Sequence, residues 1–96
     1  IRIKDREVGF GARPYLIAEM SGNHNQSLDR ALEIVDAAAA SGADAIKLQT
    51  YTADTMTLNT RAPGFVIEDP KSLWAGRQLY DLYDEAHTPG DWHRPI

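Results

Sequence analysis

The order of elements along the sequence predicts an α/β fold built on a parallel βαβ unit. Residues 15–20 and 43–50 are two short apolar runs, and residues 28–41 between them repeat apolar side chains with a helical period. Short and nearly continuous apolar runs are typical of strands that are buried on both faces of a parallel sheet. Strand, helix and strand within about 36 residues therefore predict two parallel strands joined by a right-handed crossover.

The segment before this unit, residues 1–10, predicts a short β-hairpin. Residues 1–4 alternate apolar and polar side chains, residues 5–7 offer a turn, and residues 8–10 would form the second strand. Arg13-Pro14 follows, and the residue before a proline favours extended backbone. We therefore expect an extended entry into the strand at 15–20.

The predicted helix over 28–41 carries recognisable signals at both ends. Ser27 suits the N-cap position, Asp29 lies in the first turn where the helix dipole favours an acid, and Gly42 suits a left-handed C-cap. The apolar face that it would turn toward the strands comprises Leu28, Ala31, Leu32, Val35, Ala38 and Ala39.

The second half of the sequence begins with a long irregular stretch. Residues 52–76 show no clear period, and so long a connection in an α/β protein is usually a functional loop. Residues 74–86 then predict a helix, and Thr88-Pro89 with Asp91 predicts the start of another. The apolar face of the helix at 74–86 comprises Leu79, Leu82, Tyr83 and Ala86.

Two parallel strands do not form a stable sheet alone, since three or more strands or extensive helix packing are needed. We therefore expect residues 1–96 to be the N-terminal portion of a larger (β/α)8 barrel domain, comprising the hairpin and the first two βα units. The remainder of the barrel would lie outside this sequence.

Composition excludes several classes of protein. The formal net charge is −4 and no basic stripe is present, which argues against a nucleic-acid partner. The sequence has no cysteine, which excludes disulfides and thiolate–metal sites. No apolar run approaches the roughly 20 residues of a membrane helix, and residues 1–6 lack the apolar region of a signal peptide. These features predict a cytoplasmic protein without a membrane partner.

Three polar side chains at the ends of the two strands are candidate site residues. Alternation along a strand lets Glu19 share a face with Lys47 and Gln49 if the strands are neighbours. The carboxyl ends of strands are where α/β barrels place their active sites. This set can orient a polar substrate, Lys47 can alternatively form a Schiff base, and a purely structural Glu19–Lys47 ion pair is a third interpretation.

The loop after the first strand adds Asn23 and His24 as candidates. The functional interpretation is recognition of substrate hydroxyl and amide groups, or acid–base help from the imidazole. The alternative is a turn residue beside a histidine whose hydrogen bonds are satisfied within the loop. His87 and His93 are interpreted as structural, and no metal site can be argued within these residues because no acidic ligand is in register.

Two blocks of this sequence resemble the sialic acid synthase family. Residues 17–24, Ile-Ala-Glu-Met-Ser-Gly-Asn-His, and residues 43–52, Ala-Asp-Ala-Ile-Lys-Leu-Gln-Thr-Tyr-Thr, match its first two βα units at the expected separation. Residues 50–59 and 79–83, together with Leu73-Trp74, Thr88-Pro89 and Trp92-His93, look most like the pseudaminic acid branch of that family.

This resemblance implies the condensation of phosphoenolpyruvate with 2,4-diacetamido-2,4,6-trideoxy-L-altrose, giving pseudaminic acid and phosphate. It implies that Lys47 and Gln49 hold phosphoenolpyruvate and that Glu19 is catalytic, in acid–base handling or positioning of the sugar. Asn23 and His24 would line the sugar side, and Tyr51 is a further substrate-binding residue.

The resemblance also implies a divalent metal, Mn or Mg, whose ligands lie past residue 96, and a homodimer formed through a C-terminal antifreeze-like domain that is also beyond these residues. Three alternatives stay open. One is synthesis of N-acetylneuraminic or legionaminic acid, and another is a Schiff-base aldolase. The third is a non-catalytic α/β module or inactive fragment.

Overall fold

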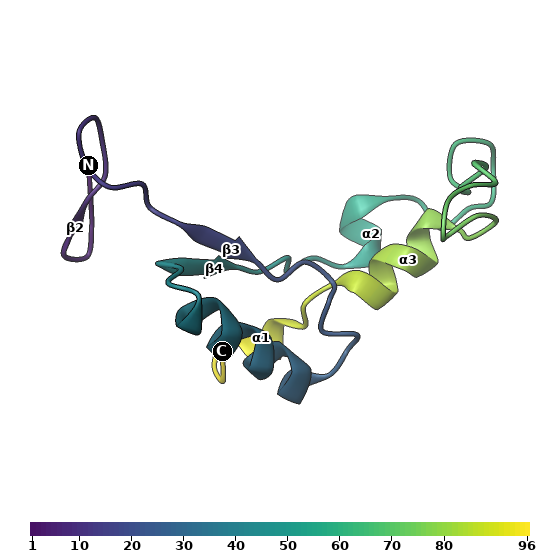
Figure 1. The fold of residues 1–96 in the computed structure, drawn as a ribbon. Coiled ribbons are helices and arrows are strands. Elements are labelled where there is room, and N and C mark those ends of the chain that lie inside the picture. Colours follow the sequence, from purple (N-terminus) through teal and green to yellow (C-terminus); the bar gives the residue numbers. More distant parts are fainter.

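The predicted βαβ unit is present in the computed structural model, which describes residues 1–96 (Figure 1). Strand β3 (Ile17–Glu19) pairs in parallel with β4 (Ala45–Lys47), and helix α1 (Leu28–Ala40) connects them. In the register of this pair, Ile17 lies opposite Ala45 and Glu19 lies opposite Lys47. The strands are shorter than the predicted runs, but their direction and order are as expected.

Helix α1 begins and ends where the sequence signals indicate. The Ser27 hydroxyl accepts a hydrogen bond from the backbone N–H of Arg30 at 3.2 Å. Gly42 follows the helix with a φ of +86°, a left-handed conformation that glycine adopts without a steric penalty. The N-cap and the glycine stop are therefore confirmed.

The hairpin at the N-terminus is confirmed, although its turn lies earlier than predicted. Strands β1 (Arg2–Ile3) and β2 (Arg6–Glu7) are antiparallel, so Arg6 and Glu7 belong to the second strand and not to the turn. Lys4 adopts a φ of +48° at the turn, where a left-handed residue matches the twist of the flanking strands. Figure 1 shows the hairpin set apart from the helices.

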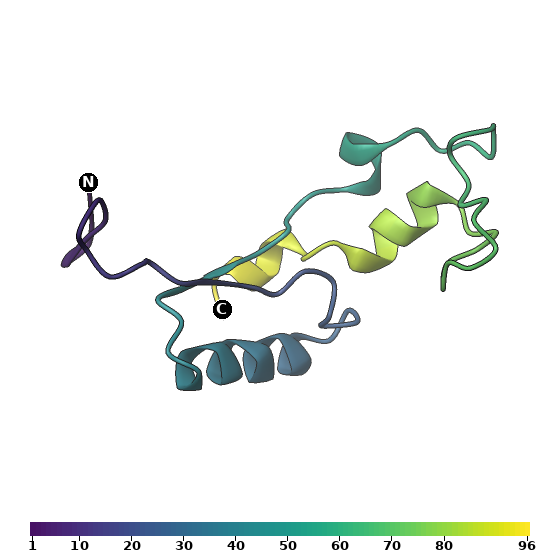
Figure 2. The same cartoon turned by 45° about the horizontal axis from the view of Figure 1, so that its top comes forward.

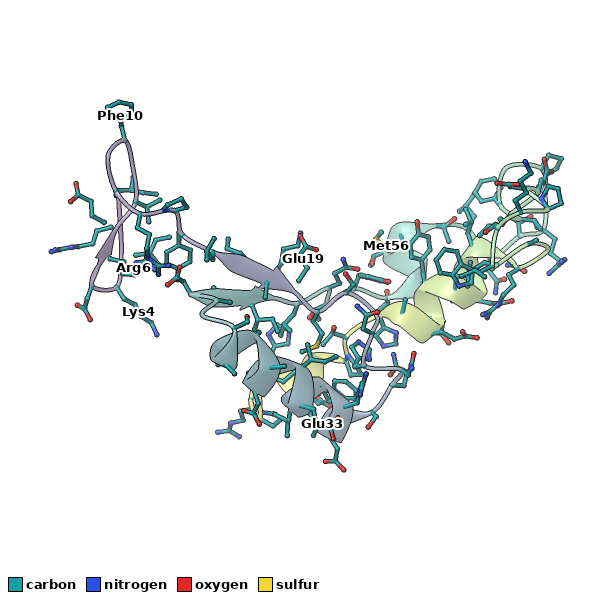
Figure 3. All side chains as sticks on the ribbon, in the orientation of Figure 1. Lys4, Arg6, Phe10, Glu19, Glu33 and Met56 are labelled. Atoms are coloured by element: carbon teal, nitrogen blue, oxygen red, sulfur yellow. The ribbon has the colours of Figure 1, made fainter.

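Helix α1 covers one face of the strand pair and leaves the other open, so within residues 1–96 only one face of the first strand is covered. Met20 is fully buried, whereas Ile17 on the open face is 58% exposed. Glu19 projects from β3 on the side away from α1 (Figure 3). The physical reason is that no other part of residues 1–96 covers this face.

The region after β4 contains more structure than its sequence pattern indicates. A short helix, α2 (Ala53–Met56), opens the segment predicted to be irregular, and an antiparallel bridge joins Val66 to Gln78. Helix α3 (Leu79–Ala86) begins later than the predicted 74, because Gly76 has a φ of +77° and residue 78 belongs to the bridge. The predicted helix at 88 is the 3₁₀ helix η1 (Gly90–His93). Figure 2 shows η1, in yellow, between α1 and α3.

The assembled segment is elongated, with extents of 48 × 31 × 25 Å. Its radius of gyration is 16.9 Å, against about 12 Å for a compact domain of this length. Its accessible surface is 7034 Å², against about 5,500 Å² for a compact protein of this mass. The buried hydrophobic residues are Met20, Ala31 and Ala53. The larger barrel stays a prediction, and none of the helices has the length and apolar character that a bilayer span requires.

Candidate functional site

An ion pair stands at the carboxyl ends of the two parallel strands. The Lys47 ammonium donates to Glu19 Oε1 at 2.7 Å, as expected for residues directly opposite in a parallel pair. Both side chains remain about half exposed, at 55% for Lys47 and 51% for Glu19. The sequence prediction that these residues share one face is therefore confirmed, and the pair is accessible to a ligand from the open side.

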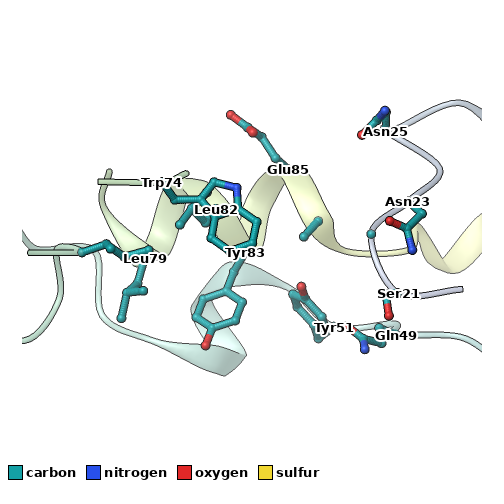
Figure 4. Close-up of a pocket in the computed structure, with 13 residues that line it drawn as sticks. Ser21, Asn23, Asn25, Gln49, Tyr51, Trp74, Leu79, Leu82, Tyr83 and Glu85 are labelled. Carbon is teal, nitrogen blue, oxygen red and sulfur yellow. The ribbon is translucent and has the colours of Figure 1, made fainter. Parts of the chain in front are cut away.

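Beside this pair, a cleft of about 590 Å³ opens between the loop after β3, the end of β4 and helix α3 (Figure 4). Three predicted site residues line it: Asn23, Gln49 and Tyr51. The cleft has a polar end around the β3 loop and a more apolar end toward α3. The remaining lining residues are Ser21, Gly22, Asn25, Ile67, Trp74, Leu79, Leu82, Tyr83, Glu85 and Ala86.

The amide of Asn23 points back onto its own loop. Its Nδ2 donates to the backbone carbonyl of Met20 at 3.0 Å, which leaves the Oδ1 acceptor available to the cleft. Ser21 and Asn25 in the same loop have φ values of +52° and +48°. These left-handed residues fold the loop tightly over the end of β3 and hold several polar groups along one side of the cleft.

Tyr51 lies where the cleft changes from polar to apolar. Its ring packs edge-to-face on Tyr83 with centroids 5.8 Å apart, and the His87 ring lies 6.3 Å away. Burial, and secondarily the neighbouring Tyr83, raises the pKa of the Tyr51 phenol. The phenol is therefore a neutral hydroxyl at physiological pH, suited to hydrogen bonding and not to acting as a base.

His24 is placed differently from the other candidates. Its side chain is fully buried and is not part of the cleft wall, and its ring packs edge-to-face on Trp92 with centroids 5.0 Å apart. Burial, and secondarily the neighbouring His87, lowers the pKa of the imidazole. The surroundings match the alternative of a satisfied loop histidine. A direct contact with substrate stays a prediction.

The rim of the cleft carries a second ion pair that the sequence pattern did not reveal. The Arg77 guanidinium forms two bonds to the Glu85 carboxylate, one of them between Nη1 and Oε2 at 3.0 Å. The hydrogen bond from Arg77 lowers the pKa of the Glu85 carboxyl. Glu85 is thus an ionised acceptor at the edge of the cleft, although its sequence context indicates only an exposed helix position.

The apolar face of α3 also lines the cleft. The sequence predicts this face, which includes Leu79, Leu82 and Tyr83, and the structure turns it toward the cleft. Trp74 was placed inside a helix, and it lies in the turn region before α3 with 53% of its surface exposed. A half-exposed tryptophan is visible only once the fold shows that nothing covers it.

Residues 1–96 bring together no group of three histidine, aspartate or glutamate side chains able to hold a metal ion. A metal expected from the sequence resemblance would therefore need ligands from elsewhere, and no chemistry is assigned to it on these residues.

Comparison with known proteins identifies relatives of this chain. The chain is 50% identical to pseudaminic acid synthase of Campylobacter jejuni over 82 residues, which are 85% of this chain and 23% of that protein. It is 49% identical to pseudaminic acid synthase of Helicobacter pylori over 83 residues, 86% of this chain and 24% of that protein. It is also 52% identical to N,N'-diacetyllegionaminic acid synthase of Legionella pneumophila over 46 residues, 48% of this chain and 13% of that protein.

The chain thus spans about a quarter of the length of the pseudaminic acid synthases that it matches. The sequence profile of the NeuB family matches residues 34–96, well over half of the chain. The matched region contains β4 with Lys47, Gln49 and Tyr51, together with the whole of α3 and η1. On this evidence the chain belongs to the NeuB family.

Proposed function

We propose that the protein containing this segment condenses phosphoenolpyruvate with 2,4-diacetamido-2,4,6-trideoxy-L-altrose to form pseudaminic acid and phosphate. The observation that carries the proposal is the identity of about 50% to two pseudaminic acid synthases over 85% of the chain. The accessible Glu19–Lys47 pair beside a cleft, at the carboxyl ends of parallel strands, supports it.

The proposed reaction forms one carbon–carbon bond and replaces the C2–O bond to phosphate by a C2–O bond from water. The C3 carbon of phosphoenolpyruvate attacks the aldehyde of the open-chain sugar, and the aldehyde oxygen takes up a proton to become a hydroxyl. Water then attacks the electron-poor C2 carbon and loses a proton, and phosphate leaves as C2 becomes a ketone. The site must therefore bind one multiply charged anion, hold an aldehyde and move protons.

Lys47 and Gln49 are the residues proposed to bind phosphoenolpyruvate. An ammonium forms strong, charge-assisted hydrogen bonds to phosphate and carboxylate oxygens, and an amide adds a directional donor. Lys47 is bonded to Glu19, so anion binding would compete for its protons and release the carboxylate. Glu19 would then be free to grip a sugar hydroxyl or to carry a proton, as a catalytic carboxylate does.

The sugar is proposed to lie in the cleft. The open amide acceptor of Asn23 and the neutral phenol of Tyr51 suit the acetamido and hydroxyl groups of such a substrate. The apolar end of the cleft, toward α3, suits the methyl group of a 6-deoxy sugar, since burying one methyl group is worth about 0.8 kcal/mol. His24 remains a proposed residue of the sugar side, although it does not line the cleft.

The remaining parts of the proposal concern groups outside these residues. A divalent metal, Mn or Mg, held by ligands outside residues 1–96 is proposed as cofactor. The residues would form the N-terminal portion of a (β/α)8 barrel, in a cytoplasmic protein that is homodimeric when complete. The exposed face of β3 and β4 supports the barrel, because barrel strands turn this face inward.

Two alternatives would use the same segment. Synthesis of legionaminic or N-acetylneuraminic acid is supported by the identity to a legionaminic acid synthase, although that match covers only 48% of this chain. A Schiff-base aldolase would use the Lys47 nitrogen as a covalent nucleophile, and that nitrogen is instead bonded to the Glu19 carboxylate at 2.7 Å. The non-catalytic module is disfavoured by the open ion pair beside a cleft.

The test is phosphate release by the full-length protein supplied with manganese or magnesium. Phosphoenolpyruvate would be offered with the altrose sugar, with the corresponding legionaminic acid precursor and with N-acetylmannosamine in parallel. We expect release with the altrose sugar alone. Release with one of the other sugars would move the protein to another branch of the family, and release with none would contradict the proposal. Borohydride trapping with pyruvate would label Lys47 only in the Schiff-base alternative.

A further inference from the structure

His24 is the largest titratable side chain that this segment buries completely, and it does not line the cleft in which the sugar is proposed to lie. Its surface is 0% exposed, and the only other fully buried polar residue is Thr88, also at 0%. Both contact each other: His24 Nε2 lies 3.4 Å from the Thr88 hydroxyl. Full burial of two polar residues far apart in sequence indicates that their link has a definite geometry.

The hydrogen bonds of His24 fix its tautomer. The backbone N–H of Gln26 donates to His24 Nδ1 at 3.0 Å, so Nδ1 is the acceptor nitrogen and carries no proton. A neutral imidazole then carries its proton on Nε2, which makes Nε2 the donor to the Thr88 hydroxyl. The ring thus bonds to the loop after β3 through Nδ1 and to the segment after α3 through Nε2.

Thr88 passes this connection to the end of β4. Its backbone N–H donates to the carbonyl of Gln49 at 2.8 Å. Gln49 lies two residues beyond Lys47 and lines the cleft. One short path of hydrogen bonds therefore runs from the loop after β3, through His24 and Thr88, to the main chain of Gln49, which is proposed to bind phosphoenolpyruvate.

A second set of contacts joins the same two segments. The Gln26 side-chain amide donates to the carbonyls of Glu85 at 3.0 Å and His87 at 2.7 Å. A Cβ added at Gly22 would lie 3.0 Å from the Cβ of Ala86, so this position has no room for a side chain. The loop and the end of α3 are therefore held face to face, and His24 is enclosed between them.

We propose that His24 is a positioning residue, which holds the main chain at Gln49 in place through Thr88 and so shapes the binding site for phosphoenolpyruvate. The inference rests on the proposed function, in which Gln49 contacts that substrate. It gives His24 a mechanical role across the site in place of a direct contact with the sugar, and it leaves Asn23 as a proposed contact of the sugar.

The test uses the full-length protein with three variants of the link. Thr88→Val removes the hydroxyl while keeping the side-chain volume, and Thr88→Ser keeps the hydroxyl. His24→Asn keeps an acceptor for the Gln26 N–H but loses the donor to Thr88. We expect His24→Asn and Thr88→Val each to raise the KM for phosphoenolpyruvate by about 5- to 20-fold, with the KM for the sugar within about twofold of wild type. Thr88→Ser should keep the KM for phosphoenolpyruvate near the wild-type value.

Thr57→Val is the matched control, because it removes a threonine hydroxyl at the end of α2, away from His24. A rise in the KM for the sugar in His24→Asn alone would overturn the proposal and make His24 a sugar contact. If His24→Asn and Thr88→Val lower the thermal midpoint but leave every kinetic constant at its wild-type value, the proposal would also be overturned. His24 would then have a structural role only.

Hydrogen exchange at the Thr88 amide separates this inference from the proposed function. We expect the backbone amide of residue 88 to exchange faster in His24→Asn and in Thr88→Val than in the wild type. If the wild-type protein releases no phosphate with any sugar, the proposed function fails, and faster exchange in both variants still supports the link between His24 and the Gln49 main chain. Unchanged exchange would overturn that link whether or not the enzyme is active.

Discussion

The two ends of the β3–β4 pair use charged side chains in opposite ways. At the amino end, the Asp44 carboxylate is 12% exposed and is engaged by Arg6, by Arg13 at 2.8 Å and by the backbone N–H of Leu16 at 2.8 Å. At the carboxyl end, Glu19 and Lys47 bond to each other and are about half exposed. A mostly buried carboxylate whose hydrogen bonds are made within the chain holds the structure together, whereas a half-exposed ion pair is available to a ligand.

The amino-end cluster joins the hairpin to the strand pair. Arg6 belongs to β2, and its guanidinium also lies over the ring of Tyr15, 5.4 Å from the centroid. Asp44 immediately precedes β4, so one carboxylate connects the hairpin, the entry to β3 and the start of β4. In barrels, polar residues at this end serve stability, whereas those at the carboxyl end serve catalysis.

The largest effect in this comparison is expected for Lys47→Ala. Losing a charge-assisted contact to an anionic substrate should lower kcat/KM of the full-length protein by about 100-fold, since such hydrogen bonds are worth about 1.5–3 kcal/mol. The thermal midpoint should hardly change, because an exposed ion pair contributes about 0–1 kcal/mol. Lys71→Ala, an exposed lysine in the loop before α3, is the control. Loss of stability in place of activity would show that the Glu19–Lys47 pair is structural.

A smaller but still clear effect is expected for Gly22→Ala, which tests the contact between the carboxyl-end loop and α3. The added methyl group would meet the Cβ of Ala86 at 3.0 Å and its backbone at 3.2 Å. Overpacking of this kind costs about 1–3 kcal/mol. Gly9→Ala is the matched control, because its Cβ would meet nothing within 4 Å. Equal thermal midpoints for the two variants would mean that the loop moves freely away from α3.

At the amino end, Asp44→Asn should destabilise without a direct effect on the site. The Leu16 N–H bond first, and the two arginines after it, lower the pKa of the Asp44 carboxyl. The stability that its charge contributes is therefore present above the ordinary value of 3.8 and is lost as the pH falls through the lower folded pKa. At neutral pH the variant should melt about 2–5 °C lower than wild type. Asp36→Asn on α1 is the control, and a shared midpoint would show that the cluster is dispensable.

Local sequence signals predicted the βαβ unit well because the causes of its structure are local. Ser27 and Gly42 act within one helical turn of their position, and the alternation that places Glu19 beside Lys47 follows from strand geometry. The hairpin turn was misplaced because Lys4, which adopts the left-handed conformation, carries no turn signal of its own. Residues 52–78 were missed in part because α2 has only one turn and the bridge from Val66 to Gln78 joins residues twelve apart.

The candidate site was predictable where it lies on the strands or in the loops that directly follow them. The sequence places Lys47 and Gln49 at a strand end, and the structure does so as well. The sequence does not show that Thr88 contacts His24, 64 residues away, or that Arg77 pairs with Glu85 at the rim of the cleft. Contacts of this kind depend on how α3 returns to the strands, which no local pattern encodes.

The smallest expected effect concerns His24, which is neither saturated by a charge nor open to solvent. Burial first, and His87 after it, lowers its pKa, so the unfolded protein binds a proton more readily than the folded one. Stability from neutral His24 is therefore present above the ordinary value of 6.5 and declines as the pH falls from there toward the lower folded pKa. The slope should correspond to the uptake of at most about one proton on unfolding.

Thermal midpoints of the full-length protein between pH 8 and pH 5 would measure this decline. The wild type should lose stability below pH 6.5 more steeply than His24→Asn, because the variant lacks the imidazole whose pKa is lowered on folding. His87→Gln should make the decline smaller by removing the repulsive neighbour, and so raising the folded pKa toward its ordinary value. Parallel curves for wild type and His24→Asn would mean that the imidazole gains its proton as easily in the folded protein, which is incompatible with an acceptor nitrogen enclosed against Gln26.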